Sequence, residues 1–395
     1  MGLWDKDRPQ DFWRITRAVP DEVWAEAIKK ATPVLAIQGL AGEDNIERIL
    51  DNTLGEGQFG TRHWELSTMK RQYYMLKPLI PRALTRIMRR IYSDRTKKVF
   101  PLGWPIEDRY VLFLWETLRL VLSLMDWKDV PFVYFWPKKN SFALILTHDI
   151  ETAGGQSYIR RLVDLEEGLG WRSSFNFIPE RYPLDKAQME WLRERGFEIG
   201  VHGLKHDGRE FFNKRTFLER AKKINNYMKE FNAVGFRAPL THRNPEWMQE
   251  LEIGYDASFF DTDPFEPIPG GVMTIWPYWL GRFIEMPYTL VQDYSLINLL
   301  EEKSPRIWLE KVEFIRKYHG MVLINTHPDY LMKSGNLQVY ADFLQEMKKF
   351  PDAWNVLPGE AAAWWRLRSE VDPLSPDVNM KIANARVIDE RLIIE

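Results

Sequence analysis

The stretch that decides the fold is Phe142-Ala143-Leu144-Ile145-Leu146-Thr147-His148-Asp149-Ile150-Glu151. Its first five residues form a short apolar run, and the polar residues that follow end this run abruptly. A buried strand of a parallel sheet has this pattern, because helices cover both of its faces. In folds built from such strands, functional side chains lie at the carboxyl ends of the strands. The segment from Thr147 to Glu151 therefore predicts a functional site at this end of the sheet.

Strand and helix patterns alternate along the chain that follows. The patterns predict strands over 173–178, 197–201, 234–237 and 321–325, and helices over 184–195, 213–231, 245–251, 305–318 and 337–350. Such alternation is typical of an α/β barrel or an open parallel sheet. Beyond residue 365, a short alternating segment over 385–394 predicts an edge hairpin. We expect a main domain over 131–370 and a tail over 371–395.

The first 130 residues, in contrast, have the pattern of a mainly helical extension. Apolar residues recur at helical spacing over 68–93, where many Lys and Arg residues also lie, and 108–125 predicts a second, more apolar helix. A basic amphipathic helix can contact a membrane surface or an acidic glycan. The more common arrangement is a helix packed on its own domain with a solvated basic face, and we expect this arrangement. Peripheral membrane contact by 68–93 stays the alternative.

Composition narrows the classes of function. The chain has 395 residues, 45% of them hydrophobic, and a net charge of −2, so no overall field attracts it to nucleic acid. It has no cysteine, which excludes disulfides, thiolate nucleophiles and thiolate metal sites. The N-terminal residues do not have the pattern of a signal peptide, and no run approaches the roughly 18 apolar residues of a membrane span. We expect a soluble, cytoplasmic enzyme; nothing in the sequence indicates its oligomeric state.

Four of the seven histidines fall at predicted strand ends, namely His148, His202, His206 and His327. The His202-x-x-x-His206 spacing supplies two imidazoles that, with one carboxylate, form the three-ligand set of a catalytic zinc site. Asp149 and Glu151 leave an extended chain on the same face and can both reach that site, whereas His148 points to the opposite face. Chance spacing of two unrelated histidines is the alternative to a metal site.

Amide hydrolysis at such a metal needs a base and an acid. One carboxylate of the Asp149–Glu151 pair can bind the metal while the other takes a proton; the alternative is a helix cap. His327 is the candidate acid for the leaving amine, and the alternative is a structural histidine. Arg237 can hold the base carboxylate ionised and oriented, and the alternative is a surface ion pair.

Five segments, in this order, resemble the motifs of the polysaccharide deacetylases of the NodB-homology type, which are grouped as carbohydrate esterase family four. Thr147-His148-Asp149-Ile150-Glu151 resembles the first motif, Thr-Phe-Asp-Asp, and His202-Gly203-Leu204-Lys205-His206 resembles the second, His-(Ser/Thr)-x-x-His. Arg237-Ala238-Pro239 resembles the third, Tyr255-Asp256-Ala257-Ser258 with Asp261-Thr262-Asp263 the fourth, and Leu323-Ile324-Asn325-Thr326-His327-Pro328 the fifth. The resemblance covers about residues 136–370.

This resemblance implies a distorted (β/α) barrel of about seven strands and a divalent metal, commonly zinc, with manganese or cobalt as alternatives. By position, Glu151, His202 and His206 would be the metal ligands. Asp149 would be the base, with Asp149 as ligand the alternative. Two positions differ from the family: the adjacent Asp-Asp pair is Asp149-x-Glu151, and Gly203 stands where a hydroxyl residue is usual.

The remaining catalytic roles implied by the resemblance go to His327 as acid, Arg237 orienting the base, and Asp256 adjusting the histidine. The implied reaction removes N-acetyl groups from a saccharide, either a poly- or oligosaccharide or a lipid- or nucleotide-linked precursor. Exposed aromatics at the rim would hold the sugar, and Trp276, Tyr278 and Trp279 are the candidates. The alternatives are hydrolysis of a small non-sugar amide or ureide, and a non-catalytic carbohydrate-binding barrel.

Overall fold

The computed structural model describes residues 2–76, 96–138, 140–376 and 380–395. The helices and helical turns are α1 (Pro9–Trp13), α2 (Asp21–Ala31), η1 (Thr32–Leu35), α3 (Ile46–Asn52), η2 (Gly57–Phe59), α4 (Thr68–Leu76), α6 (Arg109–Leu124), α7 (Ala153–Leu169), α8 (Lys186–Glu194), α9 (Lys214–Glu230), η4 (Pro239–Thr241), α10 (Pro245–Met248), η5 (Tyr294–Leu299), α11 (Arg306–Lys317), α12 (Pro328–Leu331), α13 (Asn336–Met347) and α14 (Pro358–Glu370). The strands are β1 (Asp129–Val133), β2 (Phe142–Ile150), β3 (Ser174–Phe177), β4 (Glu198–His202), β5 (Gly235–Arg237), β6 (Tyr255–Asp256), β7 (Tyr278–Leu280), β8 (Phe283–Glu285), β9 (Met321–Thr326), β10 (Ala353–Asn355), β11 (Ile382–Ile388) and β12 (Arg391–Ile394).

A nine-stranded sheet forms the centre of the fold, and β2 is its longest strand. The order along the sheet is β10-β2-β3-β4-β5-β6-β8-β7, with β9 also paired to β2. Every pair is parallel except β7 with β8. One edge of β2 pairs with β9, whereas β10 and β3 share the other edge, beside its start and its end respectively. The predicted α/β fold with a parallel sheet is thus confirmed.

The chain beyond β8 brings the two sides of the sheet together. The backbone N–H of Tyr288 donates to the carbonyl of Phe259 at 3.0 Å, on the β6 side. The next two N–H groups, of Thr289 and Leu290, both donate to the carbonyl of Leu323 in β9 at 3.1 Å. The sheet is therefore curled into a distorted barrel, as the sequence predicts, although with nine strands rather than about seven.

Strand β2 extends further than its apolar run predicts. All nine of its residues are buried, including Thr147, His148 and Asp149, which the sequence placed beyond the strand. Burial of these polar side chains is tolerated because each is hydrogen-bonded. His148, for example, lies 2.7 Å from both Thr326 Oγ1 and Glu166 Oε1. Because side chains alternate along a strand, His148 and Asp149 point to opposite faces, as expected.

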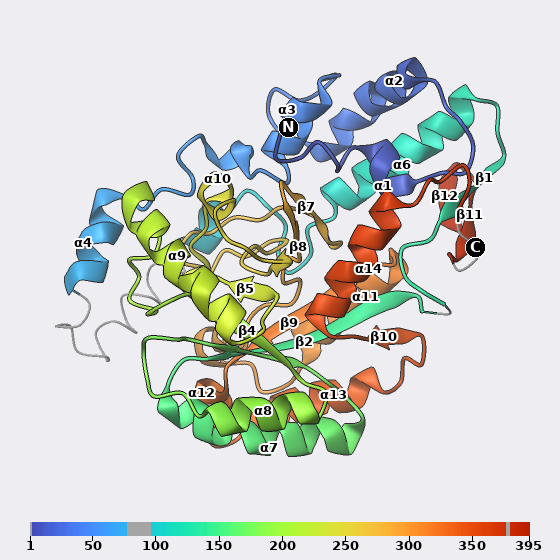
Figure 1. Ribbon diagram of the computed structural model, residues 1–395. Coiled ribbons are helices and arrows are strands. Elements are labelled where there is room, and N and C mark those ends of the chain that lie inside the picture. The colour runs from blue at the N-terminus through green and yellow to red at the C-terminus, as the bar shows by residue number, and fades with distance from the viewer. Residues whose placement is uncertain (1, 77–95, 139, 377–379) are drawn as a thin grey trace.

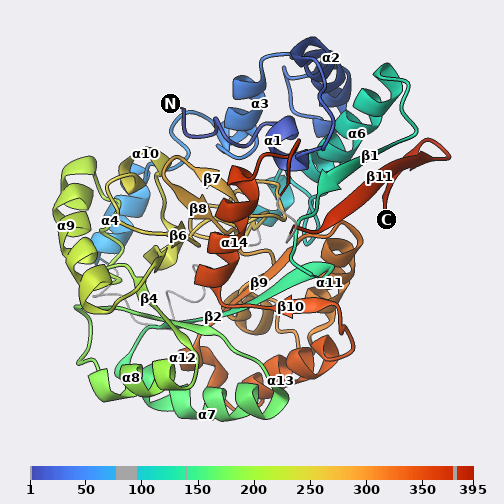
Figure 2. The same cartoon turned by 45° about the vertical axis from the view of Figure 1, so that its right-hand side comes forward.

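Two groups of helices lie on opposite sides of the sheet. In both views α7, α8, α12 and α13 lie together on one side, and the N-terminal helices α1, α2, α3 and α6 lie together on the other (Figures 1 and 2). Capping side chains set where the outer helices begin: Thr152 for α7, Asp185 for α8 and Asn213 for α9 each accept backbone N–H groups of the first turn. Helix α14 packs against β2, β6 and β8.

The N-terminal region and the barrel share one hydrophobic core, which runs from Trp4 to Leu392. Arg368 of α14 is buried and donates to the backbone carbonyls of Phe12, Val133 and Tyr134 at 2.7–3.0 Å. The predicted hairpin near the C-terminus is present as β11 and β12, but β11 pairs with β1 in a separate three-stranded sheet. The domain limits at 130 and 370 thus remain a prediction within a continuously packed structure.

A buried ion pair also links the N-terminal region to a loop of the barrel. Arg243, which follows β5, donates from Nε to Glu56 Oε2 at 2.7 Å and from Nη2 to Glu56 Oε1 at 2.5 Å. Both side chains are fully buried. Glu56 also accepts the indole N–H of Trp64 at 2.9 Å and the backbone N–H of Gly271 at 2.8 Å. The carboxylate is therefore satisfied from both parts of the chain.

Of the basic helix expected over 68–93, α4 accounts for 68–76, and 77–93 lie outside the described residues. Lys70 of α4 donates to the carbonyl of Pro267 at 2.7 Å, and the guanidinium of Arg71 lies 5.4 Å from the ring centre of Phe212. Helix α4 is therefore packed on loops that follow β4 and β6. Within 2–76, 96–138, 140–376 and 380–395, no helix is long and apolar enough to cross a membrane. Peripheral membrane contact by 68–93 stays the alternative.

Candidate metal centre and active site

The candidate site lies at the carboxyl ends of four parallel strands. Strand β2 carries Asp149 and is followed directly by Glu151, and β4 ends at His202. Strand β5 ends at Arg237, and β9 ends one residue before His327. Because β9, β2, β3, β4 and β5 are neighbours in the sheet, their ends meet at one edge. The structure thus brings together the strand ends that the sequence singled out.

Glu151, His202 and His206 form a group that fits a metal ion. One ligand atom of each lies within 4.8 Å of the others, and no other group of three or more His, Asp or Glu side chains among the described residues does so. His206 Nε2 lies 2.9 Å from Glu151 Oε1. Two imidazoles and a carboxylate are the donor set of catalytic zinc sites, which leave positions open for water and substrate.

The orientation of His202 supplies the test of this fit. Its Nδ1 lies 3.1 Å from the backbone carbonyl of Arg237, which can only accept, so Nδ1 carries the hydrogen. In the neutral ring Nε2 then holds a lone pair. This Nε2 is buried and has no hydrogen-bond partner among the described residues. A buried lone pair aimed at a second histidine and a carboxylate is the arrangement of a metal ligand held by an outer hydrogen bond.

The charge states of this group also suit a metal. Burial lowers the pKa of His202 to about 4, against the opposing effect of Asp149, so the imidazole is neutral at neutral pH. Burial raises the pKa of Glu151, but His206, with His327 and His202, outweighs it and the net shift is downward. The carboxylate is therefore ionised. Neutral imidazole and ionised carboxylate are the forms that bind a metal.

The loop between the two histidines explains why residue 203 is glycine. Gly203 has φ +57°, a left-handed conformation that favours glycine, and an added Cβ would overlap the ring of Pro239. The same Cβ would lie 2.8 Å from Glu210 Oε1. The buried Glu210 accepts the backbone N–H of Leu204 at 3.0 Å and so holds the loop. The hydroxyl residue usual in the resembling family has no room at this position.

Asp149 is held by three side chains beside the metal ligands. Its Oδ1 accepts from Asn176 Nδ2 at 2.9 Å and from Arg237 Nη1 at 3.2 Å, and its Oδ2 accepts from Asn325 Nδ2 at 2.9 Å. Burial raises the pKa of Asp149, but His202, Arg237 and His327 together outweigh burial, and the net shift is strongly downward. The carboxylate is thus ionised and fixed in orientation, and it is not a helix cap.

The Oδ2 atom of Asp149, which accepts from Asn325, also faces two histidines. Oδ2 lies 3.9 Å from His202 Nε2 and 3.9 Å from His327 Nε2. Asp149 itself is not part of the three-residue ligand group. Glu151 thus lies with His202 and His206, and Asp149 lies between His202 and His327. The roles of these two carboxylates as ligand and base stay a prediction.

Arg237 is buried rather than part of a surface ion pair. Its Nε donates to the carbonyl of Ala257 at 2.7 Å, and its Nη1 also donates to Thr147 Oγ1 and Asn325 Oδ1 at 2.8 Å each. These bonds fix the guanidinium, since Arg donors have a rigid planar geometry. Arg237 therefore orients both Asp149 and Asn325, which in turn contacts Asp149.

His327 is paired with Asp293, a buried carboxylate that the sequence reasoning missed. His327 Nδ1 lies 2.7 Å from Asp293 Oδ1, and the backbone N–H of His327 donates to Asp293 Oδ2 at 2.8 Å. Burial lowers the pKa of His327, but Asp293, with Glu151 and Asp149, outweighs it and raises the pKa to about 9. The imidazole is therefore protonated at neutral pH, with Nε2–H directed to the site.

The role expected for Asp256 is not supported, because the carboxylate at His327 is Asp293. Asp256 accepts the hydroxyl of Ser258 at 2.6 Å and is paired in register with Glu285 of β8. Burial raises the pKa of both Asp256 and Glu285. Ser258 also accepts the backbone N–H of Ala238 at 2.7 Å. Asp256 thus braces the chain beside Arg237 rather than His327.

Asn176 and Asn325 could have been found, since each lies near the carboxyl end of a predicted strand. Neither was predicted as a site residue, because an uncharged amide at a strand end does not by itself indicate a catalytic or metal-binding role. Asp293 lies in a segment without a strand or helix pattern, and no signal in the sequence marks it. Asp329, in contrast, follows the predicted strand over 321–325 and comes two residues after His327. Asp329 accepts the backbone N–H of Glu151 at 3.1 Å.

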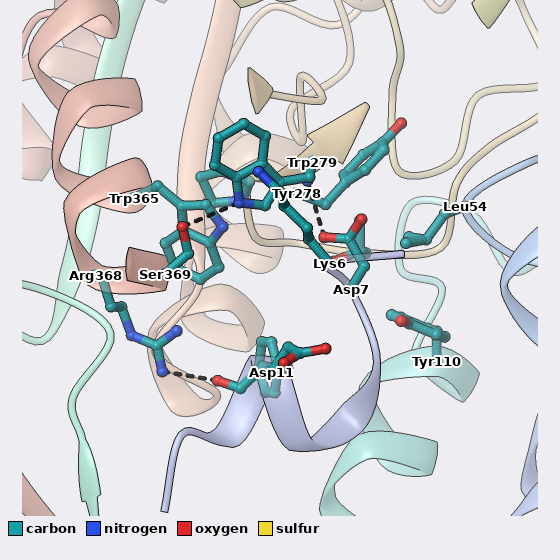
Figure 3. Close-up of a pocket in the computed structure, with 13 residues that line it drawn as sticks. Lys6, Asp7, Asp11, Leu54, Tyr110, Tyr278, Trp279, Trp365, Arg368 and Ser369 are labelled. Carbon is teal, nitrogen blue, oxygen red and sulfur yellow. Dashed lines mark hydrogen bonds between the residues drawn. The ribbon is translucent and has the colours of Figure 1, made fainter. Parts of the chain in front are cut away.

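The aromatic residues expected to hold the sugar are not at the rim. Trp276, Tyr278 and Trp279 are 0%, 3% and 3% exposed. Tyr278 and Trp279 line a cavity of about 30 Å³ between the barrel and the N-terminal region, together with Asp7 and Arg368 (Figure 3). The expectation was wrong because an aromatic run looks the same in sequence whether it packs in a core or lines a cleft.

Aromatic side chains beside the site are instead three half-buried tyrosines. Tyr182 donates to the carbonyl of Ile150 at 2.6 Å. The ring of Tyr330 lies 5.0 Å from the rings of both His327 and Tyr294. Tyr330 thus lies against the candidate acid with Tyr294 beside it, and Tyr182 contacts the end of β2.

No family model matches the sequence, and no curated protein matches it. Solved structures similar to the chain include a putative polysaccharide deacetylase from Mycobacterium smegmatis, at 19% identity and a TM-score of 0.47 over 62% of this chain and 95% of that chain. A probable polysaccharide deacetylase from Pseudomonas aeruginosa PAO1 has 15% identity and a TM-score of 0.46, over 59% and 93%. The PuuE allantoinase has 14% identity and a TM-score of 0.46, over 59% and 92%. Two of these three bear the name of the family that the sequence motifs resemble.

Proposed function

We propose that this protein is a metal-dependent amide hydrolase that removes N-acetyl groups from a saccharide. The observation that carries the proposal is the placement of Asp149 Oδ2 at 3.9 Å from both His202 Nε2 and His327 Nε2. The ionised carboxylate thus lies between the metal-binding group and a protonated imidazole. Amide hydrolysis needs these three functions together: an electrophilic centre, a base and an acid.

Glu151, His202 and His206 would hold the metal, and zinc suits this donor set best, with manganese or cobalt as alternatives. A divalent ion bound there would supply Lewis acidity, which polarises the amide carbonyl and lowers the pKa of a water molecule. His202 needs no deprotonation before binding, because its neutral form is already the stable one. Its backbone partner keeps Nε2 directed at the ion.

Asp149 and His327 would carry the protons. The water delivers its oxygen to the acetyl carbon and a proton to Asp149 Oδ2, whose other bonds keep the carboxylate in place. When the C–N bond breaks, Nε2–H of His327 donates to the departing nitrogen, because an unprotonated amine is a poor leaving group. The products are acetate and a free amine. Asp293 stabilises the protonated form of His327 before this transfer.

The saccharide part of the proposal rests on the five motifs that resemble polysaccharide deacetylases. The half-buried tyrosines beside the site, Tyr182, Tyr294 and Tyr330, provide apolar ring surface of the kind that packs against sugar rings. A poly- or oligosaccharide and a lipid- or nucleotide-linked precursor both present the same N-acetyl group. The experiment below therefore compares N-acetyl groups on free saccharides with those on a nucleotide-linked sugar.

The test measures acetate release by purified full-length protein loaded with Zn²⁺, Mn²⁺ or Co²⁺. Substrates are chitooligosaccharides, N-acetylated cell-wall fragments and a UDP-linked N-acetylhexosamine, with acetamide and allantoin as small-amide comparisons. We expect release from at least one saccharide, lost in His202→Ala and in Asp149→Asn, and retained in the control Asp164→Asn, which removes an exposed carboxylate on α7. Activity confined to the small amides would replace the saccharide part of the proposal, and absence of bound metal would refute the mechanism.

A further inference from the structure

We propose that Asp329 is a positioning residue that fixes the metal ligand Glu151 relative to the acid His327. This inference rests on the proposed function, because it concerns the geometry of the same site. Asp329 lies in the short helix α12, two residues after His327. The metal-binding turn between β2 and α7, however, lies about 180 residues earlier, with separations of 177 and 178. A single carboxylate joins the two segments.

Both oxygens of Asp329 bond to that turn. Oδ2 accepts the backbone N–H of Glu151 at 3.1 Å, and Oδ1 accepts the hydroxyl of Thr152. The two donors belong to consecutive residues, so the carboxylate fixes the direction of the chain as well as its position. Charge-assisted hydrogen bonds of this kind are stronger than bonds between neutral groups.

Thr152 couples this carboxylate to the start of helix α7. Its Oγ1 accepts the backbone N–H groups of Gly154 and Gly155 at 3.1 and 3.2 Å, while its own hydrogen goes to Asp329. The 17-residue helix therefore begins at a cap that is itself held by α12. The negative charge of Asp329 also lies near the positive end of the helix dipole, which favours it there.

Gly155 leaves room for the carboxylate. A Cβ at this position would overlap Oδ2 of Asp329 and would lie 2.8 Å from its Cγ, so a larger residue would displace the side chain. A Cβ on the neighbouring Gly154 would meet only Thr152 Oγ1 at 3.3 Å and Met332 Cε at 3.8 Å. Two adjacent glycines thus differ sharply in their relation to Asp329.

Helix α12 reaches the side chain of Glu151 as well as its backbone. Tyr330, the residue after Asp329, directs its hydroxyl to Glu151 Oε2 at 3.5 Å, and the other carboxylate oxygen lies 2.9 Å from His206 Nε2. A shift of α12 would therefore move the ligand oxygen and His327 together. Residues that orient a metal ligand in this way commonly affect metal affinity by about 10- to 100-fold.

The first experiment compares Asp329→Ala with Asp185→Ala in the full-length protein. Asp185 caps α8 by accepting the backbone N–H of Gln188 at 3.0 Å, and it does not contact the metal-binding turn. Both variants lose a carboxylate at a helix start, so a purely structural role would lower the melting temperature of both and change Zn²⁺ affinity in neither. We expect Zn²⁺ affinity, measured by competition with a chromogenic chelator, to fall about 10- to 100-fold in Asp329→Ala alone.

The second experiment uses the glycine pair and keeps the inference testable if Asp329→Ala does not fold. Gly155→Ala should weaken Zn²⁺ binding by displacing Asp329, whereas Gly154→Ala should leave it within about twofold of the wild type, because its Cβ overlaps no atom and comes no closer than 3.3 Å, to Thr152 Oγ1. Equal Zn²⁺ affinity in the wild type, Asp329→Ala and Gly155→Ala would overturn the positioning role while leaving the proposed function intact. Failure of the wild type itself to bind Zn²⁺ would overturn both.

Discussion

His327 Nδ1 lies 2.7 Å from Oδ1 of Asp293, a buried carboxylate that precedes it by 34 residues. This contact reverses the effect of burial on the histidine. An isolated buried imidazole has a lowered pKa and is neutral at physiological pH, whereas His327 has a pKa raised to about 9. The pairing thus provides a proton donor beside Asp149, whose Oδ2 lies 3.9 Å from His327 Nε2.

Replacing Asp293 with Asn should move the alkaline limb of the pH–rate profile to lower pH. The acid must be protonated, so activity falls as pH rises through the pKa of His327; removing the charge of Asp293 lowers that pKa, by about 1–3 units for a close ion pair. The measurement is kcat/KM for the proposed deacetylation across pH 6–10. Asp342→Asn, an exposed carboxylate on α13, serves as the control. An unchanged alkaline limb in Asp293→Asn would show that His327 is not the acid.

Asp149→Asn and Glu151→Gln should separate the two carboxylates. If Asp149 is the base, Asp149→Asn lowers kcat by about 10²- to 10⁴-fold and leaves metal content near that of the wild type. Glu151→Gln, by contrast, should lose bound metal, because a neutral amide is a poorer ligand than a carboxylate. Metal content by elemental analysis and kcat are measured on the same preparations. Loss of metal in Asp149→Asn, with retention in Glu151→Gln, would reverse the two roles.

Glu198 should make folding stability depend on pH. Burial raises the pKa of Glu198 from 4.5 to about 7, against its hydrogen bonds from Tyr255 and Gly359. Between these values the folded state holds a proton that the unfolded state releases, so stability is lost as pH rises from about 5 to 7. The loss is roughly 2–3 kcal/mol.

Urea unfolding at pH 5 and pH 8 checks this expectation. Glu198→Gln cannot ionise, so its free energy of unfolding should change less between the two pH values than that of the wild type. Glu194→Gln removes an exposed carboxylate at the end of α8 and should behave as the wild type does. A pH dependence in Glu198→Gln equal to that of the wild type would mean that Glu198 ionises with an ordinary pKa.

Breaking the buried pair of Glu56 and Arg243 should be costly. Glu56→Gln leaves the guanidinium without its counterion in a dry environment, and the free energy of unfolding should fall by about 3–5 kcal/mol. The double variant Glu56→Leu/Arg243→Leu removes both charges and should lose less than the sum of the single leucine variants. Chemical unfolding of the wild type, the two single leucine variants and the double variant gives the coupling energy. Additive losses would indicate that the pair is not coupled.

The sequence predicted the sheet and the grouping of Glu151, His202 and His206, because both depend on local patterns. The apolar run before Asp149 and the alternation of elements define the strands, and the strand ends then bring His202 and His206 to the same edge as Glu151. The predicted site was incomplete where the hydrogen-bond partners of its residues come from irregular segments. Asp293 lies in a loop with no hydrophobic periodicity. Nothing local in the sequence distinguishes this buried residue from acidic residues at the surface.

The burial of aromatic side chains was the second property that the sequence did not predict. Trp276, Tyr278 and Trp279 read as candidate sugar contacts, yet they pack against the N-terminal region, whose arrangement the sequence did not reveal. Asn176 and Asn325 were not predicted for the opposite reason. An amide at a strand end can be recognised as a site residue only when the structure shows a buried carboxylate, such as Asp149, that accepts its hydrogen bond. Long-range packing, and not local propensity, decides both cases.

The hydrogen bonds from Arg368 to the carbonyls of Val133 and Tyr134 form only after the C-terminal part of the chain has been synthesised. The residues of the Arg368–Val133 pair are 235 positions apart. One edge of β1 is bridged to Ile15, which precedes it in the chain, whereas the other edge is paired with β11. A nascent chain emerges from the ribosome at about 5–20 residues per second, so β1 waits for at least about ten seconds before this second edge is covered. During that interval the edge is open to other chains. Folding during synthesis therefore exposes β1 to aggregation until the C-terminal segments arrive.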